Sequence, residues 1–297
     1  MSLTIGVIGL GIMGGAFAKN LVEAGFPVIG CDVLKEKKLA LEAQGGKTAS
    51  TAREVAQQAD IVITSLPAIS ALHDVMTGDD GIASAAKDGL IVIECSTMPV
   101  EDKQAAHDAL KEVGTILLDC PISGTGSQAA NKDLVVYTSG IESACEKCKP
   151  IFEGFSRLDM YVGAFGNGSK LKFIANHLVT INNVASAEAM VLGMKAGLDP
   201  QVIFDVVSAG AATSRVFELR APMMVKDEYL PATMKNDVYR KDLHVIGEFA
   251  TSLDCPTPLF SACVDIYRAT LAQGLGDEDT AAVCRVLEDM AGLKRKA

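Results

Sequence analysis

The sequence predicts an α/β domain with a doubly wound, mainly parallel sheet, followed by an all-α domain. Through the first half of the chain, short β-branched apolar runs alternate with helix-length segments. Strand then helix, repeated, is typical of a parallel sheet covered on both faces. After about residue 163 the strand signal stops, and the remainder is helical in period. The length of 297 residues fits two domains, and we place them at residues 1–163 and 164–297.

The expected strands are apolar along most of their length rather than alternating with polar residues, which indicates burial on both faces. In chain order they are residues 4–10, 27–32, 60–67, 90–97, 115–123, 133–140 and 159–163.

The second half is predicted to begin with one long helix. Residues 169–196 contain no proline, and Gly197 and Pro200 then supply stop signals. At 1.5 Å per residue such a helix is roughly 40 Å long, enough to connect two domains. Further helical segments follow, separated by loop signals at Leu230-Pro231, Pro256 and Pro258.

Composition excludes several functions. A net charge of -10 argues against a nucleic-acid partner. No apolar stretch of about 18 residues and no basic leader are present, so we expect a cytoplasmic protein without a membrane partner. The eight cysteines are expected to be reduced. Cys145 and Cys148 form a CxxC on an amphipathic helix, but no second ligand pair accompanies them, so no metal site is predicted.

A glycine motif predicts a dinucleotide site. The first strand runs into Gly9-Leu10-Gly11-Ile12-Met13-Gly14, and a helix begins there. Such glycines provide a tight turn, close approach to a pyrophosphate and close helix–strand packing, which is the Rossmann arrangement. Asp32 ends the second strand, 18 residues after Gly14. Its carboxylate suits the ribose hydroxyls of NAD and repels the 2′-phosphate of NADP. NAD is therefore expected; Lys35, nearby, keeps NADP as the alternative.

Two further loops leave strands at the edge where ligands of such sheets collect. One contains Leu66 and Pro67, and the other contains Thr97. Leu66 and Pro67 are candidate cofactor contacts. Thr97 either bonds the nicotinamide ribose or caps the helix that follows.

Alcohol oxidation with a nicotinamide cofactor needs a proton acceptor. On the long helix, Lys172, Asn176, Thr180 and Asn183 recur at spacings of four, four and three, so they form one polar stripe. A polar row on a packed helix needs partners, which are either solvent or a ligand. A lysine whose pKa is lowered by burial could exchange a proton with the substrate oxygen.

Four ordered motifs make the sequence similar to a known family. They are the opening glycine segment, the Asp-Cys-Pro-Ile-Ser-Gly loop at 119–124, the Gly-x-Gly-x-x-x-Lys-x-x-x-Asn run ending at Asn176, and Lys241-Asp242-Leu243. Over nearly its whole length the chain resembles the β-hydroxyacid dehydrogenase family, which includes 3-hydroxyisobutyrate, tartronate semialdehyde and L-threonate enzymes.

The resemblance implies interconversion of a small 3-hydroxy acid and its semialdehyde or keto acid, in a homodimer or homotetramer. It makes Lys172 the catalytic acid/base, with Lys170 as the nearby competitor. It also implies that the substrate is bound by Ser123, Gly124, Thr125, Asn176, Lys241 and Asp242, and that Lys241 contacts the cofactor as well. Thr125 stands where the family usually has a second glycine, and Met234 where it often has phenylalanine, so the substrate is left open.

Two alternatives stay open. One is an NADPH-dependent reductase of glyoxylate or succinic semialdehyde. The other, from a different functional class, is a non-catalytic dinucleotide-sensing module. The histidine–asparagine pattern of 6-phosphogluconate dehydrogenase is missing after Lys172, which disfavours a sugar phosphate substrate.

Overall fold

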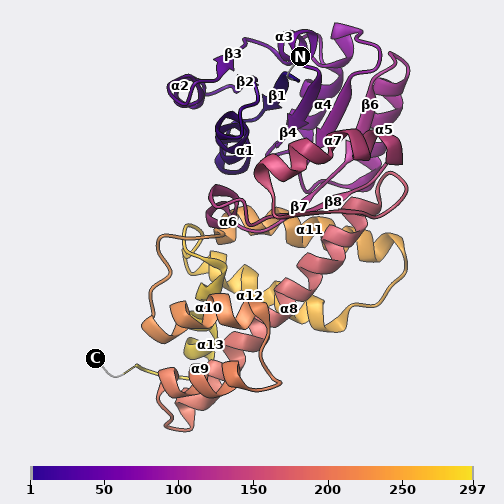
Figure 1. Ribbon diagram of the computed structural model, residues 1–297. Coiled ribbons are helices and arrows are strands. Elements are labelled where there is room, and N and C mark those ends of the chain that lie inside the picture. Colours follow the sequence, from indigo (N-terminus) through magenta and orange to yellow (C-terminus); the bar gives the residue numbers. More distant parts are fainter. Residues whose placement is uncertain (1–2, 296–297) are drawn as a thin grey trace. The chain divides into compact units, whose positions relative to one another are not determined.

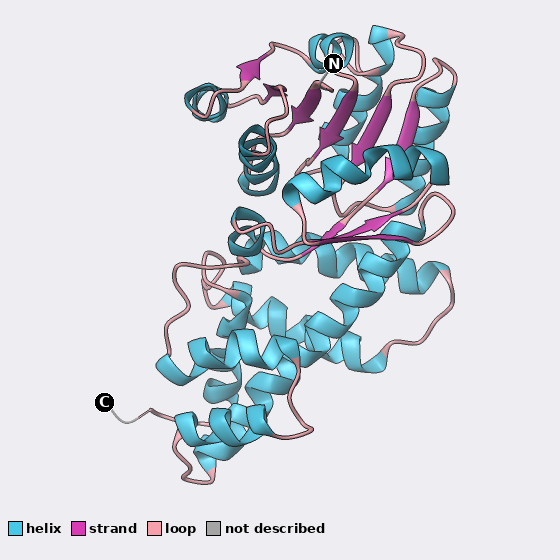
Figure 2. Cartoon of the chain, viewed as in Figure 1, coloured by secondary structure: helices cyan, strands magenta, loops and turns pink. Residues whose placement is uncertain are grey.

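A computed structural model describes residues 3–295, and the chain divides into two compact units at Lys172/Phe173. All strands that the described residues form lie in the first unit (Figures 1 and 2). Among the described residues of the second unit, every named element is a helix. The predicted fold class, a Rossmann domain followed by an all-α region, is confirmed.

The main sheet of the first unit has six parallel strands in the order β3-β2-β1-β4-β5-β6. The chain moves outward from β1 to β3 and then returns to the other side of β1 at β4. In such a sheet the ligand crevice lies at the carboxyl ends of the strands around this reversal. The strands are β1 (Ile5–Ile8), β2 (Val28–Cys31), β3 (Lys47–Thr48), β4 (Ile61–Thr64), β5 (Ile91–Glu94) and β6 (Ile116–Asp119).

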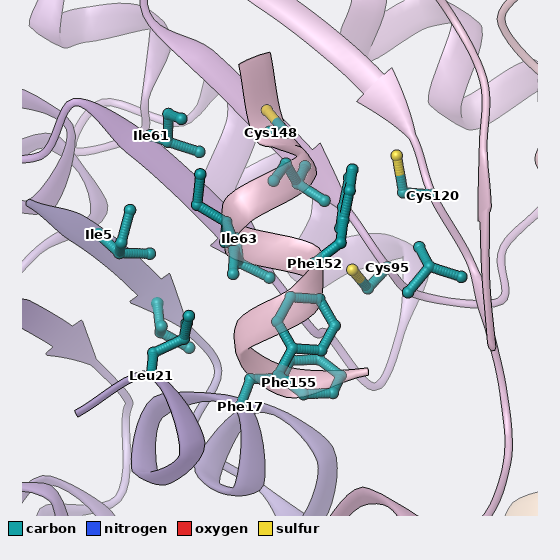
Figure 3. Close-up of a cluster of buried hydrophobic side chains, with 14 of the residues drawn as sticks. Ile5, Phe17, Leu21, Ile61, Ile63, Cys95, Cys120, Cys148, Phe152 and Phe155 are labelled. Atoms are coloured by element: carbon teal, nitrogen blue, oxygen red, sulfur yellow. The ribbon is translucent and has the colours of Figure 1, made fainter. Parts of the chain in front are cut away.

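Helices cover both faces of this sheet, and each face has its own apolar core. On one face, Ile5 and Ile63 pack with Phe17 of α1 and Phe152 of α7 (Figure 3). The other face packs around Val62 and the helices α3, α4 and α5. The helices of the first unit are α1 (Ile12–Glu23), α2 (Lys35–Ala43), α3 (Ala52–Gln58), α4 (Ile69–Thr77), η1 (Ala83–Ala85), α5 (Val100–Lys111), α6 (Gly126–Ala130) and α7 (Glu142–Phe155).

A second, three-stranded sheet was not expected. It has the order β7-β8-β9, with β7 (Ile122–Ser123) antiparallel to β8 (Val135–Thr138) and β8 parallel to β9 (Leu158–Tyr161). The single strand predicted over 115–123 is wrong: it divides into β6 and β7 at Cys120-Pro121. The reason is that Pro121 has no N–H to donate to a ladder. β9 is largely exposed, so burial on both faces does not extend to this sheet.

The long helix is confirmed as α8 (Asn167–Lys195). Its first residues, through Lys172, belong to the first unit, and its remainder belongs to the second. The other helices are α9 (Pro200–Ala209), α10 (Arg215–Lys226), α11 (Asn236–Ser252), α12 (Pro258–Ala272), η2 (Thr280–Ala282) and α13 (Val283–Met290). Across residues 3–295, no helix is both long and apolar enough to cross a bilayer.

Candidate active site

The three glycines of the motif, of which Gly9 and Gly11 lie in the loop between β1 and α1 and Gly14 in the first turn of α1, have separate geometric roles. Gly9 has φ +85°, and a Cβ placed on it would lie 2.2 Å from the carbonyl oxygen of Ser65. A Cβ on Gly14 would lie 1.9 Å from the carbonyl oxygen of Gly9. A Cβ on Gly11 would meet nothing within 4 Å. The first and third glycines are therefore required by packing, and the second faces open space.

The start of α1 suits an anion. Its N-cap residue is Gly11, which offers no side-chain cap, and its first turn contains no acidic residue. The terminal N–H groups and the positive end of the helix dipole are thus left for another acceptor. Together with the open space over Gly11, this arrangement fits the pyrophosphate of a dinucleotide. Leu10 lies in the loop, Ile12 and Met13 begin α1, and Ile12 is 78% exposed.

Asp32 follows β2 directly and is bonded to the glycine loop. Its Oδ2 accepts the N–H of Leu10 at 2.6 Å, and its Oδ1 accepts the N–H of Leu34 at 2.8 Å. Each carboxylate oxygen can accept a further hydrogen bond. The carboxylate is therefore held in place and still able to bind ribose hydroxyls.

Leu66, Pro67 and Thr97 lie beyond the carboxyl ends of β4 and β5. The two loops are connected, because the N–H of Leu66 donates to Oγ of Ser96 at 2.8 Å. Helix α5 begins at Val100 with Pro99 as its N-cap and has no side-chain cap. Thr97 therefore does not cap this helix, and the other reading, contact with the nicotinamide ribose, stays a prediction.

The Ser123-Gly124-Thr125 segment joins β7 to α6. Gly124 has φ +141°, a conformation that L side chains rarely adopt. The N–H of Thr125 donates to Oε1 of Gln128 at 3.0 Å. The turn is thus fixed by its own residues.

The first turn of α8 packs tightly against the end of β6. A Cβ on Gly168 would lie 2.6 Å from the carbonyl oxygen of Asp119, so only glycine fits there. The N–H of Ser169 donates to Oδ2 of Asp119 at 2.7 Å. Three residues further, Lys172 is only 9% exposed, whereas Lys170 is exposed. Burial separates the two candidate lysines, because Lys172 is shielded from bulk solvent and Lys170 is not.

The polar stripe of α8 is buried, so bulk solvent is not its partner. In the second unit, Nδ2 of Asn176 donates to Oδ2 of Asp242 at 2.8 Å. Oγ1 of Thr180 lies 2.8 Å from the hydroxyl of Tyr239, and Nδ2 of Asn183 donates to the hydroxyl of Tyr267 at 2.7 Å. Thr180 and Asn183 are therefore engaged in internal packing. The candidate catalytic part of the stripe is reduced to Lys172 and Asn176.

Lys241 and Asp242 lie on α11, and Nζ of Lys241 is 3.9 Å from Oδ1 of Asp242. The loop before this helix is held by a buried carboxylate: Oδ2 of Asp279 accepts the N–H groups of Thr233 and Met234 at 2.7 and 3.1 Å. Asp242 contacts both Asn176 and Lys241, so these three residues form one group within the second unit. The glycine loop, Asp32, Leu66, Pro67, Thr97, Ser123, Gly124, Thr125 and Lys172 belong to the first.

Reasoning from the sequence missed one charged cluster. Glu94, Lys103 and Asp119 are each fully buried in the first unit. Nζ of Lys103 lies 2.6 Å from Oε2 of Glu94 and 2.7 Å from Oδ1 of Asp119. A signal was present, because Glu94 and Asp119 are acidic residues at the ends of otherwise apolar strands. Lys103, on the helix between them, carries no sequence signal of its own.

The fold and the glycine loop define a nicotinamide-dinucleotide-binding protein, and comparison with known proteins specifies it further. Residues 4–165 match the NAD binding domain of 6-phosphogluconate dehydrogenase, and residues 166–287 match the domain described as NAD-binding of NADP-dependent 3-hydroxyisobutyrate dehydrogenase. The chain belongs to the β-hydroxyacid dehydrogenase family, and it is an NAD(P)-dependent enzyme of that class.

Similarity extends over almost the whole chain. An L-threonate dehydrogenase of Cupriavidus necator is 33% identical over 287 residues, 96% of each chain. Glyoxylate/succinic semialdehyde reductase 2 of Arabidopsis thaliana is 30% identical over 97% of this chain and 80% of its own. A solved structure of Mycobacterium tuberculosis 3-hydroxyisobutyrate dehydrogenase with L-serine has a TM-score of 0.88 at 30% identity, covering 97% of this chain and 99% of its own.

Proposed function

We propose that this enzyme catalyses the reversible, NAD-dependent oxidation of a small 3-hydroxy acid to its semialdehyde or keto acid, with Lys172 as general acid/base. The observation that carries the proposal is the placement of Lys172. It is a buried lysine within one turn of Ser169, whose N–H is bonded to the carboxyl end of the cofactor-binding sheet. A proton shuttle must be held at a fixed place relative to the cofactor, and this connection provides that.

The reaction needs a hydride acceptor and a proton acceptor. A bound nicotinamide would supply the hydride-accepting chemistry. Lys172 in its neutral form accepts the proton of the substrate hydroxyl, and as an ammonium it returns that proton during reduction. Ser123, Gly124, Thr125 and Asn176 bind the substrate carboxylate and hydroxyl, and Lys241 and Asp242 complete the site from α11.

NAD is proposed over NADP because of Asp32. Its carboxylate is held by two backbone N–H groups, so it cannot readily turn away from a ribose. A fixed negative charge there favours ribose hydroxyls and repels a 2′-phosphate.

Initial rates on a substrate panel test the function. L-Threonate, 3-hydroxyisobutyrate, L-serine, glycerate and 3-hydroxypropionate would each be supplied with NAD⁺ or NADP⁺, and absorbance of the reduced cofactor would be followed. We expect turnover of at least one acid, with NAD⁺ preferred. No turnover of any acid, together with tight dinucleotide binding, would instead indicate a dinucleotide-sensing module.

The Arabidopsis relative supports a second candidate, reduction of glyoxylate or succinic semialdehyde, for which NADPH is the expected cofactor. The same assay run in reverse, with each aldehyde and either NADH or NADPH, separates the two. A dominant NADPH-dependent rate on these aldehydes would favour this candidate over the proposed one.

We also propose that the protein is a homodimer or homotetramer. The all-α domain, residues 164–297, would then serve both substrate binding and dimerisation. Leu171, Ile174 and Leu178 on α8 are 39%, 54% and 54% exposed, an apolar stripe of the kind that subunit contacts cover. Light scattering on the purified chain measures the mass, and a monomer of 31.1 kDa would contradict the proposal.

A further inference from the structure

Glu94, Lys103 and Asp119 form a network of three charged groups in the first unit, each with no exposed surface. The contact between Lys103 and Glu94 is an ion pair, and that between Lys103 and Asp119 is both an ion pair and a hydrogen bond. None of these residues was assigned to cofactor or substrate. Their hydrogen bonds, however, extend in two directions, to the first turn of α8 before Lys172 and to the candidate cofactor contact Leu66.

In one direction the network holds the start of α8. Oδ1 of Asp119 accepts the hydroxyl of Ser169 at 2.8 Å, and its Oδ2 accepts the N–H of Ser169 at 2.7 Å. Ser139 adds a parallel connection: its Oγ accepts the N–H of Gly168 at 3.0 Å and donates to the carbonyl oxygen of Asp119 at 2.8 Å. Asp119 thus caps the helix from 50 residues away in sequence, one turn before Lys172.

In the other direction the network reaches the cofactor loops. Oε1 of Glu94 accepts the N–H of Ser96 at 2.9 Å, and Oγ of Ser96 accepts the N–H of Leu66 at 2.8 Å. Leu66 is a candidate cofactor contact, and Thr97 directly follows Ser96. The connection from Leu66 to Ser169 is therefore unbroken.

Stability alone is a weak reason for such a network. Removing charges from water costs several kcal/mol per ion, and buried ion pairs are often no more stabilising than apolar residues of the same volume. Two carboxylates against one ammonium leave a formal charge of about -1, which the N–H groups of Ser96 and Ser169 help to balance. Desolvation lowers the pKa of Lys103, but Asp119 and Glu94 raise it more, so this lysine stays charged. What the network provides is fixed geometry.

We propose that Glu94, Lys103 and Asp119 are positioning residues that act through Ser169 to hold Lys172 in register with the cofactor loops after β4 and β5. This inference rests on the proposed role of Lys172 as acid/base. None of the three touches substrate; their effect on the reaction passes through the first turn of α8.

Ser169→Ala is the least disruptive test of the connection between Asp119 and α8. It removes the hydrogen bond from the Ser169 hydroxyl to Asp119 and keeps the one from the backbone N–H. Ser139→Ala loosens the parallel connection and serves as an independent second variant. Ser156→Ala is the matched control: Ser156 is also a buried serine of the first unit, and its hydroxyl donates to the carbonyl oxygen of Phe152 at 2.8 Å. Thermal unfolding of each variant shows whether it is folded.

We expect Ser169→Ala and Ser139→Ala to lower kcat by about ten- to hundredfold, the effect of misplacing a catalytic group by about 1 Å. KM and the Kd for NADH should stay within about twofold, because the loops that bind are not altered, and Ser156→Ala should match the wild type. A merely structural role would lower stability in all three serine variants without separating kcat from KM.

The outcomes are distinct. If Lys172→Ala is inactive and both connecting variants keep wild-type kcat, the positioning role is wrong and the proposed function stands. An equal loss of kcat in Ser156→Ala, or a loss of NADH binding in Ser169→Ala, also contradicts the positioning role. If the wild type oxidises no hydroxy acid, or if Lys172→Ala keeps its activity, both proposals fail.

Discussion

Asp32 and Leu10 are joined by a 2.6 Å hydrogen bond, in which Oδ2 of the carboxylate accepts the backbone N–H. This bond ties the residue that directly follows β2 to the glycine loop that follows β1. The two parts of a dinucleotide site, one for ribose and one for pyrophosphate, are thereby fixed relative to each other before any ligand binds.

Cofactor choice is expected to depend on the charge of Asp32. Asp32→Asn keeps a carbonyl acceptor but removes the charge, so the ratio of kcat/KM for NAD⁺ to that for NADP⁺ should fall. A charge-assisted hydrogen bond contributes about 1.5–3 kcal/mol, so the ratio should fall by about ten- to hundredfold. Asp60→Asn is the control, because Asp60 also accepts a backbone N–H, that of Thr4 at 2.8 Å. An unchanged ratio in Asp32→Asn contradicts the assignment.

Substitutions at two glycines of the motif, Gly11 and Gly14, should affect cofactor binding and stability separately. Gly11→Ala adds a methyl group where no atom lies within 4 Å, so the Tm should be unchanged while the Kd for NADH rises at least about tenfold. Gly14→Ala places its methyl group 1.9 Å from a backbone oxygen. It should therefore lower the free energy of unfolding by about 1–3 kcal/mol or more. Gly247→Ala, also in open space, is the neutral control for binding. Normal NADH affinity in Gly11→Ala would count against the pyrophosphate site.

The cysteines are predicted to act as packing residues rather than as a redox pair. Burial raises the pKa of Cys145 to about 11 and that of Cys148 to about 12, so both stay protonated near pH 8. Because the thiolate is the reactive form, an aromatic disulfide reagent at pH 8 should titrate exposed Cys255 first and half-buried Cys31 more slowly. All eight should react in denaturant. Rapid modification of Cys145 in the folded protein would contradict this.

The fold could be predicted because its signals are local. Glycine spacing, apolar strands and the absence of proline over 169–196 each act within a few residues. Five strands of the main sheet and α8 followed from them, whereas the two-residue edge strand β3 (Lys47–Thr48) was missed because it has no apolar run. The second sheet could not be predicted in the same way. Its formation depends on Pro121 interrupting a run that otherwise favours one strand, and on pairing between β7 and β8 across α6.

The candidate site was predictable only as a set of residue types. The sequence placed Lys172 and Asn176 on one helical face, but burial, which distinguishes Lys172 from Lys170, is a tertiary property. Likewise, Lys103 is one of many helical lysines in the sequence. Only the fold brings its ammonium between two carboxylates from β5 and β6.

The central claim is that Lys172 exchanges the substrate proton. Its most direct measurement is kcat for hydroxy-acid oxidation in Lys172→Ala, with Lys170→Ala as the neighbouring lysine control and NADH affinity measured in both. General acid–base catalysis contributes about 10²–10⁴-fold, so Lys172→Ala should lose at least about a hundredfold in kcat and still bind NADH, while Lys170→Ala resembles the wild type. Near-normal kcat in Lys172→Ala, or a comparable loss in Lys170→Ala, would contradict the account.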